Sequence, residues 1–93
     1  MFIQTEVTPN PNTLKFIPGV QVLEEGTVEF KDKDSAKISN LANLIFLISG
    51  IDRVFLATEF VSVTKSNEKN WEILKPLILT GIMDHYASGK EVI

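Results

Sequence analysis

The sequence contains no cysteine among its 93 residues. This absence excludes disulfide bonds, thiolate nucleophiles, cysteine-ligated zinc and any iron–sulfur cluster held by thiolates of this chain. Only one histidine, His85, is present, which excludes sites that need two imidazole ligands, such as the zinc site of HExxH proteases. We therefore expect neither a disulfide-stabilised fold nor a metal centre built from several histidines.

Basic residues and long apolar runs are also scarce. Nine lysines and arginines face twelve acidic residues, for a net charge of −3, and Arg53 is the only arginine. Nucleic-acid-binding domains carry a basic footprint, so we expect no nucleic-acid partner. The longest apolar run, Leu44–Ile48, is far shorter than the roughly 20 residues of a membrane helix, so we expect no membrane association.

The N-terminus offers no targeting signal. Its first four residues, Met1-Phe2-Ile3-Gln4, lack the basic region of a secretory signal peptide. We therefore expect a cytosolic chain, or one in a compartment that is reached after a presequence has been removed.

The length predicts a single domain over residues 1–93 with a thin core, because separate cores arise only in much longer chains. Five short segments favour β-strands by composition or alternation. They are Phe2–Val7, Leu14–Ile17, Thr27–Phe30, Asp52–Ala57 and Phe60–Thr64. The last two, separated by Thr58-Glu59, give the strongest hairpin signal.

Two segments favour helices. The first follows a serine cap at Ser35 or Ser39, carries an apolar stripe that begins at Ile38, and ends near Gly50. The second is capped by Asn70, runs from about Trp71 to Ala87 and ends at Gly89. Because Pro76 removes one helical hydrogen bond, we expect a separate tight turn before it and regular helix after it.

The predicted fold is α+β: one small two-layer domain in the order βββαββα, with two helices on one face of a mostly antiparallel sheet. Three helix residues carry further expectations. Gly81 indicates a close helix–sheet approach, Trp71 is expected to be largely buried, and His85 is expected to be partly exposed near the helix C-terminus.

No catalytic constellation is visible, so we predict that the chain is not an enzyme. The glycines are scattered rather than gathered in a phosphate loop, and no serine has a histidine and carboxylate near it in sequence. Asp84 and His85 are adjacent on a helix, so their side chains diverge and form no dyad.

Surface carboxylates leave one metal-binding alternative open. Five acidic residues could weakly hold a hard cation such as iron, although a solvated surface is the favoured interpretation. They are Glu24, Glu25, Glu29, Asp32 and Asp34.

The segment Thr8–Phe16 (TPNPNTLKF) is more informative, because a simple turn seldom needs so many specified residues. It resembles the hallmark of the N-terminal domain of the Nfu family, the NifU-like iron–sulfur cluster scaffold and carrier proteins. Further blocks of the same resemblance follow in order along essentially the whole chain. They are Met1–Thr5, Gly50-Ile51-x-x-Val54-Phe55, Phe60-Val61-x-Val63-Thr64-Lys65, Trp71-x-x-Leu74-Lys75-Pro76 and Ile82-Met83-Asp84-His85.

The resemblance implies a non-catalytic domain that acts through protein contacts in iron–sulfur cluster assembly. Longer family members add a C-terminal Cys-x-x-Cys domain that binds a [4Fe–4S] cluster, usually across a dimer. The resemblance therefore assigns no cofactor to this chain, and residues 89–93 fall where the linker or C-terminal tail would begin. The implied partners are cluster-assembly proteins or client apo-proteins, in a bacterial cytoplasm or, after presequence removal, the mitochondrial matrix.

The candidate partner-binding residues are Asn10, Asn12, Thr13 and Lys15. Two prolines stiffen this turn, which lowers the entropy lost on binding, and exposed amides can bind a partner's backbone. On this hypothesis, Asn12→Ala and Lys15→Ala leave the melting temperature almost unchanged. The alternative is structural: the asparagines cap their own turn, and Lys15 is a strand residue with no role in binding.

Overall fold

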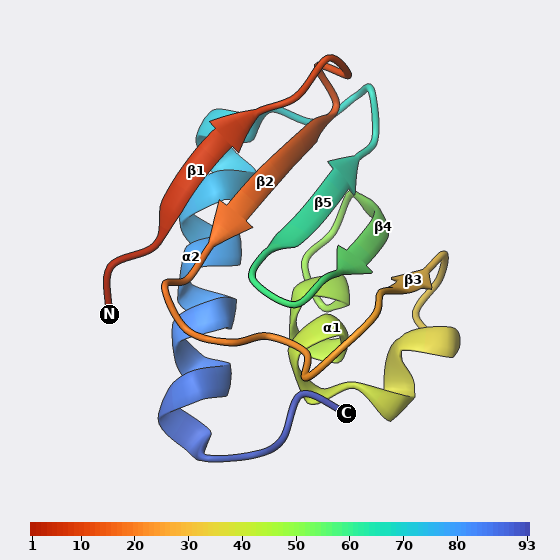
Figure 1. The fold of residues 1–93 in the computed structure, drawn as a ribbon. Coiled ribbons are helices and arrows are strands. Elements are labelled where there is room, and N and C mark those ends of the chain that lie inside the picture. Colours follow the sequence, from red (N-terminus) through yellow and green to blue (C-terminus); the bar gives the residue numbers. More distant parts are fainter.

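The computed structural model describes all 93 residues and confirms the α+β prediction and its βββαββα order (Figure 1). The strands are β1 (Gln4–Val7), β2 (Thr13–Ile17), β3 (Val28–Phe30), β4 (Ile51–Leu56) and β5 (Val61–Lys65). The helices are the 3-10 helix η1 (Ser35–Ile38), α1 (Asn40–Phe46) and α2 (Trp71–Ser88). No helix of the chain combines the length and apolarity that crossing a bilayer requires.

All five strands form one antiparallel sheet in the order β1-β2-β5-β4-β3, so β1 and β3 lie at its edges (Figure 1). The register places Val7 opposite Leu14 and Leu14 opposite Val63. Alternation along β5 sends Val61 and Val63 into the core. Lys65 continues that inward series and is only 8% exposed, which the sequence pattern did not indicate.

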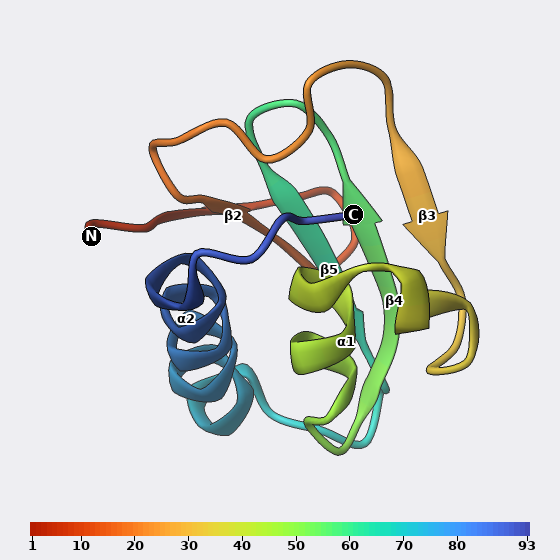
Figure 2. The same ribbon diagram turned by 90° about the horizontal axis from the view of Figure 1, so that it is seen from below.

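Both α-helices cover the same face of the sheet, and the other face is open (Figure 2). α2 buries Leu74, Ile78 and Ile82, while α1 buries Leu41 and Ile45. These side chains join the inward residues of the sheet in one apolar cluster. Burial of such side chains stabilises a fold by about 1.5–3 kcal/mol each.

The helix starts follow the predicted caps. Ser39, rather than Ser35, caps α1 by accepting from the amide of Ala42 over 3.1 Å. Asn70 caps α2 by accepting from the amide of Glu72 over 2.8 Å. Each cap satisfies an amide that the first helical turn leaves without a partner.

Several finer predictions are wrong. α2 is one continuous helix through Pro76, since only one hydrogen bond is lost close to its start. Ile38 belongs to η1 and is 65% exposed, because the change of helix type rotates it away from the stripe. Val22 and Leu23, for which the sequence made no prediction because their segment has no periodic pattern, are core residues.

Gly81 and Trp71 also differ from expectation. A Cβ at Gly81 would have no neighbouring atom within 4 Å, so no close approach to the sheet explains this glycine. Trp71 is half-buried at the rim of the core rather than largely buried, because it occupies the first turn of α2 at the end of the sheet.

Candidate functional site

The loop between β1 and β2, residues 8–12, is called the Pro–Asn loop below. Its own side chains fix its shape: the hydroxyl of Thr8 accepts from the amide of Asn10 over 3.2 Å. The side-chain oxygen of Asn10 accepts from the amide of Asn12 over 2.9 Å, which is a local turn of the kind that asparagine favours. The loop is therefore held in one conformation, with Pro9, Asn10 and Pro11 exposed.

Residues far away in sequence hold the loop against the body of the domain. The backbone amide of Lys65 donates to the carbonyl of Asn12 over 2.8 Å, and its ammonium group donates to the Asn12 side-chain oxygen over 3.0 Å. The Asn12 amide nitrogen donates to the side chain of Asn67. The indole N–H of Trp71 donates to the carbonyl of Pro11 over 2.9 Å.

Thr13 and Lys15 lie on the open face of the sheet. The hydroxyls of Thr13 and Thr64 hydrogen-bond across the strand pair over 2.8 Å. The ammonium group of Lys15 lies 3.7 Å from a carboxylate oxygen of Glu6 and 4.2 Å from the centre of the Phe60 ring, a cation–π distance. Lys15 is therefore half-buried against an aromatic ring.

The structure thus brings Asn10 and Asn12 together at one end of the sheet and sends Thr13 and Lys15 onto its open face. Both asparagine side chains bond within the domain, so the geometry gives Asn12 a role in holding the fold. Sequence reasoning missed Lys65 and Asn67 as neighbours of the loop. No local signal reveals them, because 53 and 55 positions separate them from Asn12.

A hollow of about 310 Å³ lies beside the Pro–Asn loop. Besides the loop, its lining comes from both strands that the loop connects and from the start of α2. These contributors are Val7 of β1, Thr13 and Leu14 of β2, and Trp71. Val7 is 86% exposed, so an apolar side chain stands uncovered at the mouth of this hollow.

His85 lies in a second polar environment, and the prediction that it is partly exposed is wrong. The side chain is completely buried, because α2 turns it toward α1. Its Nδ1 lies 2.7 Å from the amide nitrogen of Asn40, and its Nε2 has no hydrogen-bond partner. Burial lowers the pKa of His85 below its usual value, since the charged imidazolium is poorly solvated there.

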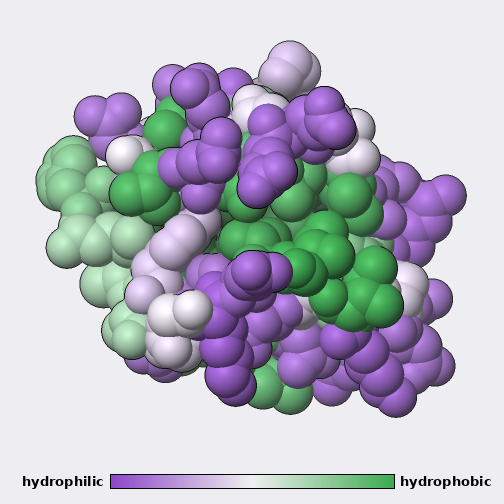
Figure 3. Space-filling view, turned by 60° about the horizontal axis from the view of Figure 1, so that its bottom comes forward, coloured by the Kyte–Doolittle hydropathy of each residue, from purple (hydrophilic) through white to green (hydrophobic).

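His85 and Tyr86 border a hollow between residues 21–24 and the C-terminal segment 90–93. The Tyr86 hydroxyl donates to the carbonyl of Gln21 over 3.3 Å, and burial raises its pKa. Figure 3 views the end of the molecule that is at the bottom of Figure 1, and hydrophobic residues gather in the middle of that face. No carboxylate forms a hydrogen bond with either ring nitrogen of His85.

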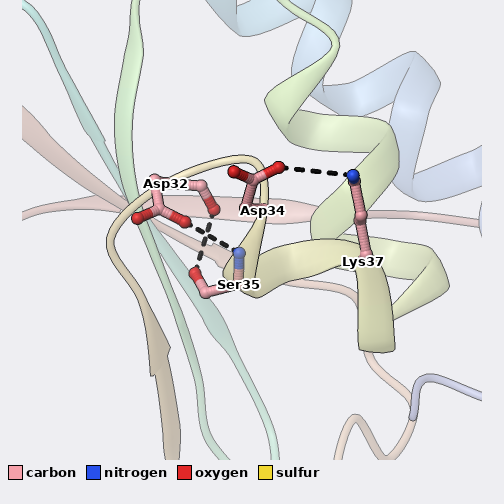
Figure 4. A network of polar contacts seen from close by, with 4 residues as sticks. All are labelled: Asp32, Asp34, Ser35 and Lys37. Carbon is pink, nitrogen blue, oxygen red and sulfur yellow. Dashed lines mark hydrogen bonds and ion pairs between the residues drawn. The ribbon is translucent and has the colours of Figure 1, made fainter.

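The acidic residues around η1 stabilise a turn (Figure 4). A carboxylate oxygen of Asp32 accepts from the amide of Ser35 over 2.7 Å, and this bond holds the pKa of Asp32 below its ordinary value. Asp34 pairs with Lys37 over 3.3 Å. No group of three or more histidine or acidic residues lies close enough to hold a metal ion, so the carboxylate alternative has no ligand set in this structure.

Comparison with known proteins places these features in a family. Residues 3–89 match the family described as scaffold protein Nfu/NifU N terminal. The chain is 51% identical over 90 residues to NifU-like protein 5, mitochondrial, of Arabidopsis thaliana, covering 97% of this chain and 33% of that protein. It is 52% identical over 90 residues to the human protein NFU1 iron-sulfur cluster scaffold homolog, mitochondrial, covering 96% and 35% respectively.

Solved structures agree with the fold. The solution structure of a NifU-like protein from Saccharomyces cerevisiae superposes with a TM-score of 0.84 at 30% identity, over 99% of this chain and 83% of that one. The crystal structure of SAV1430 from Staphylococcus aureus gives 0.74 at 28% identity, over 87% and 98%. The chain spans about a third of the length of the two curated relatives.

Proposed function

The chain belongs to the Nfu/NifU scaffold N-terminal family, and from this premise we propose that it is a non-catalytic interaction and positioning domain in iron–sulfur cluster assembly. It binds assembly proteins or client apo-proteins and does not hold the cluster itself. A cluster needs thiolate ligands, or imidazole in part, and the chain has no cysteine and one buried histidine. The two relatives compared above are named as mitochondrial, and we propose the mitochondrial matrix as its location.

One observation carries the proposal: the Pro–Asn loop is exposed, yet it is anchored to β5 and α2 by hydrogen bonds from Lys65 and Trp71. A loop already held in its bound shape loses little conformational entropy when a partner binds. Its exposed residues, together with Thr13 and Lys15 on the adjoining strand, form the proposed partner-binding surface.

The test measures affinity for a purified cluster-assembly protein by calorimetry. Lys15→Ala removes a charge beside the loop, and we expect at least a fivefold loss of affinity, or about 1 kcal/mol. Lys37→Ala is the matched control, because Lys37 is exposed and pairs with Asp34 around η1. Equal affinity for both variants and the unaltered chain, with unchanged melting temperatures, contradicts the proposed surface.

A further inference from the structure

The edge strand β1 has a free side. It pairs only with β2, so every second residue directs its backbone N–H and C=O away from the sheet. Natural edge strands are commonly blocked by lysine, proline, bulges or very short length. β1 is itself short, at four residues, but it contains no lysine and no proline, and its one charge, on Glu6, faces Lys15 across the strand pair.

The opposite edge, β3, is better protected. It has only three residues, Val28–Phe30, and Glu29 pairs with Arg53 over 3.8 Å. A run of alternating charge, residues 31–34, follows it directly. Of the two edges, β1 is therefore the one open to pairing with another strand.

A side-chain site lies next to this free edge. Val7 pairs with Leu14, and Leu14 is buried, so both face the helix side of the sheet. The hollow of about 310 Å³ is lined by Val7 at this edge and, among other residues, by Pro9, Pro11 and Trp71. A strand added beside β1 would present its inward side chains toward the exposed Val7 and the mouth of this hollow.

We propose that β1 accepts an extended segment of a partner protein as a sixth strand, with one apolar side chain of that segment in the hollow between Val7 and Trp71. This inference deepens the proposed function and rests on it, because it names the kind of partner segment that the domain binds. Backbone hydrogen bonds supply affinity in this mode, and the side-chain pocket supplies selectivity. A helix does not fit the edge, since its backbone groups bond internally.

The probe is a capped peptide, Lys-Thr-Val-Thr-Val-Thr-Lys, followed by amide NMR on the whole chain. We expect shifts confined to residues 4–7, the Pro–Asn loop and the indole N–H of Trp71. The peptide Lys-Thr-Val-Pro-Val-Thr-Lys is the matched control, because proline removes a backbone donor at its centre. We expect its affinity to be at least tenfold lower.

Two variants of the chain distinguish peptide binding at the β1 edge from non-specific binding to exposed apolar residues. Val7→Lys places a blocking charge on a residue that is 86% exposed, and we expect at least a tenfold loss of affinity. Ile73→Lys, at 67% exposure, changes an apolar residue of α2 outside the hollow and is expected to bind normally. Sedimentation of the free chain tests whether a second copy occupies the edge instead.

Four results overturn the inference. Three concern the peptide: no binding up to about 1 mM peptide, shifts centred elsewhere, or equal affinity of Val7→Lys. Dimers that Val7→Lys disrupts overturn it too, because the edge then serves self-association. The peptide can fail to bind while the assembly partner still binds and loses affinity in Lys15→Ala. That result would contradict strand addition at β1 and leave the proposed function supported.

Discussion

The ammonium group of Lys65 donates to the side-chain oxygen of Asn12 over 3.0 Å, and the two residues also join through a backbone hydrogen bond of 2.8 Å. Lys65 is only 8% exposed, and none of the ion pairs of the chain involves it. A neutral amide oxygen therefore helps to solvate a buried cation and at the same time fixes the Pro–Asn loop to the end of β5. Without Asn12, the ammonium group would keep the carbonyl of Ser66, at 3.3 Å, as its hydrogen-bond acceptor within the chain and would be less well solvated.

Asn12→Ala should consequently destabilise the domain. Removing one partner of a buried charged donor costs about 1–3 kcal/mol, so the free energy of unfolding in urea is expected to fall by that amount. This replaces the expectation from the sequence that the variant leaves stability unchanged.

The double variant Asn12→Ala/Lys65→Met isolates the contact. If the Asn12–Lys65 bond is responsible, the loss caused by Asn12→Ala should shrink in the Lys65→Met background. Additive losses in the two backgrounds would assign the effect to the Asn67 contact instead.

Trp71 links the same loop to the start of α2. Because the ring is half-buried and its N–H bonds the carbonyl of Pro11, Trp71→Ala should cost about 2–3 kcal/mol, less than a fully buried ring. Trp71→Phe keeps most of the packing and should cost about 1 kcal/mol for the lost hydrogen bond. Urea unfolding of both variants measures the difference. A Trp71→Phe variant as stable as the unaltered chain would show that the hydrogen bond contributes nothing, and equal losses would show that the packing of the ring contributes nothing.

Gly81 offers a stabilising change. It lies in the interior of α2 with open space where a Cβ would stand, so Gly81→Ala is expected to stabilise the domain by about 0.5–1 kcal/mol. Gly89→Ala is the matched control, because Gly89 ends α2 with a φ of 73°, which strains an alanine. A thermal melt that moves both variants in the same direction contradicts this account.

The sequence predicted the elements better than the site because the two depend on different ranges of contact. Strand alternation, a serine cap at one of two positions and the Asn70 cap are local patterns, and they place the strands and the helix starts correctly. The burial of His85 and Lys65 depends instead on which helix or loop lies across from them. The anchoring of Asn12 by residues more than fifty positions away leaves no trace in its own neighbourhood.

Cluster binding by the isolated chain can be tested directly. Anaerobic incubation with iron and sulfide, followed by desalting, is expected to leave no iron–sulfur chromophore, because the chain provides no thiolate. A stable chromophore with stoichiometric iron and sulfide would contradict the proposal that the chain positions partners without holding the cluster.

The buried His85 should make stability depend on pH, with a loss that begins as the pH falls below about 7. Its pKa is lowered in the folded chain by burial, whereas the unfolded chain titrates near the usual value of about 6.5. The unfolded state therefore binds more protons between these two pKa values, and stability is highest above about pH 6.5 and falls as the pH decreases toward the folded pKa. Urea unfolding at pH 7.5 and 5.5 should show the loss at the lower pH.

His85 is the only histidine, so His85→Gln should remove most of this dependence. The glutamine keeps an amide within reach of Asn40, although the variant is expected to lower stability at both pH values. If the variant shows the same slope as the unaltered chain, the protons are taken up elsewhere and the burial of His85 is not the cause.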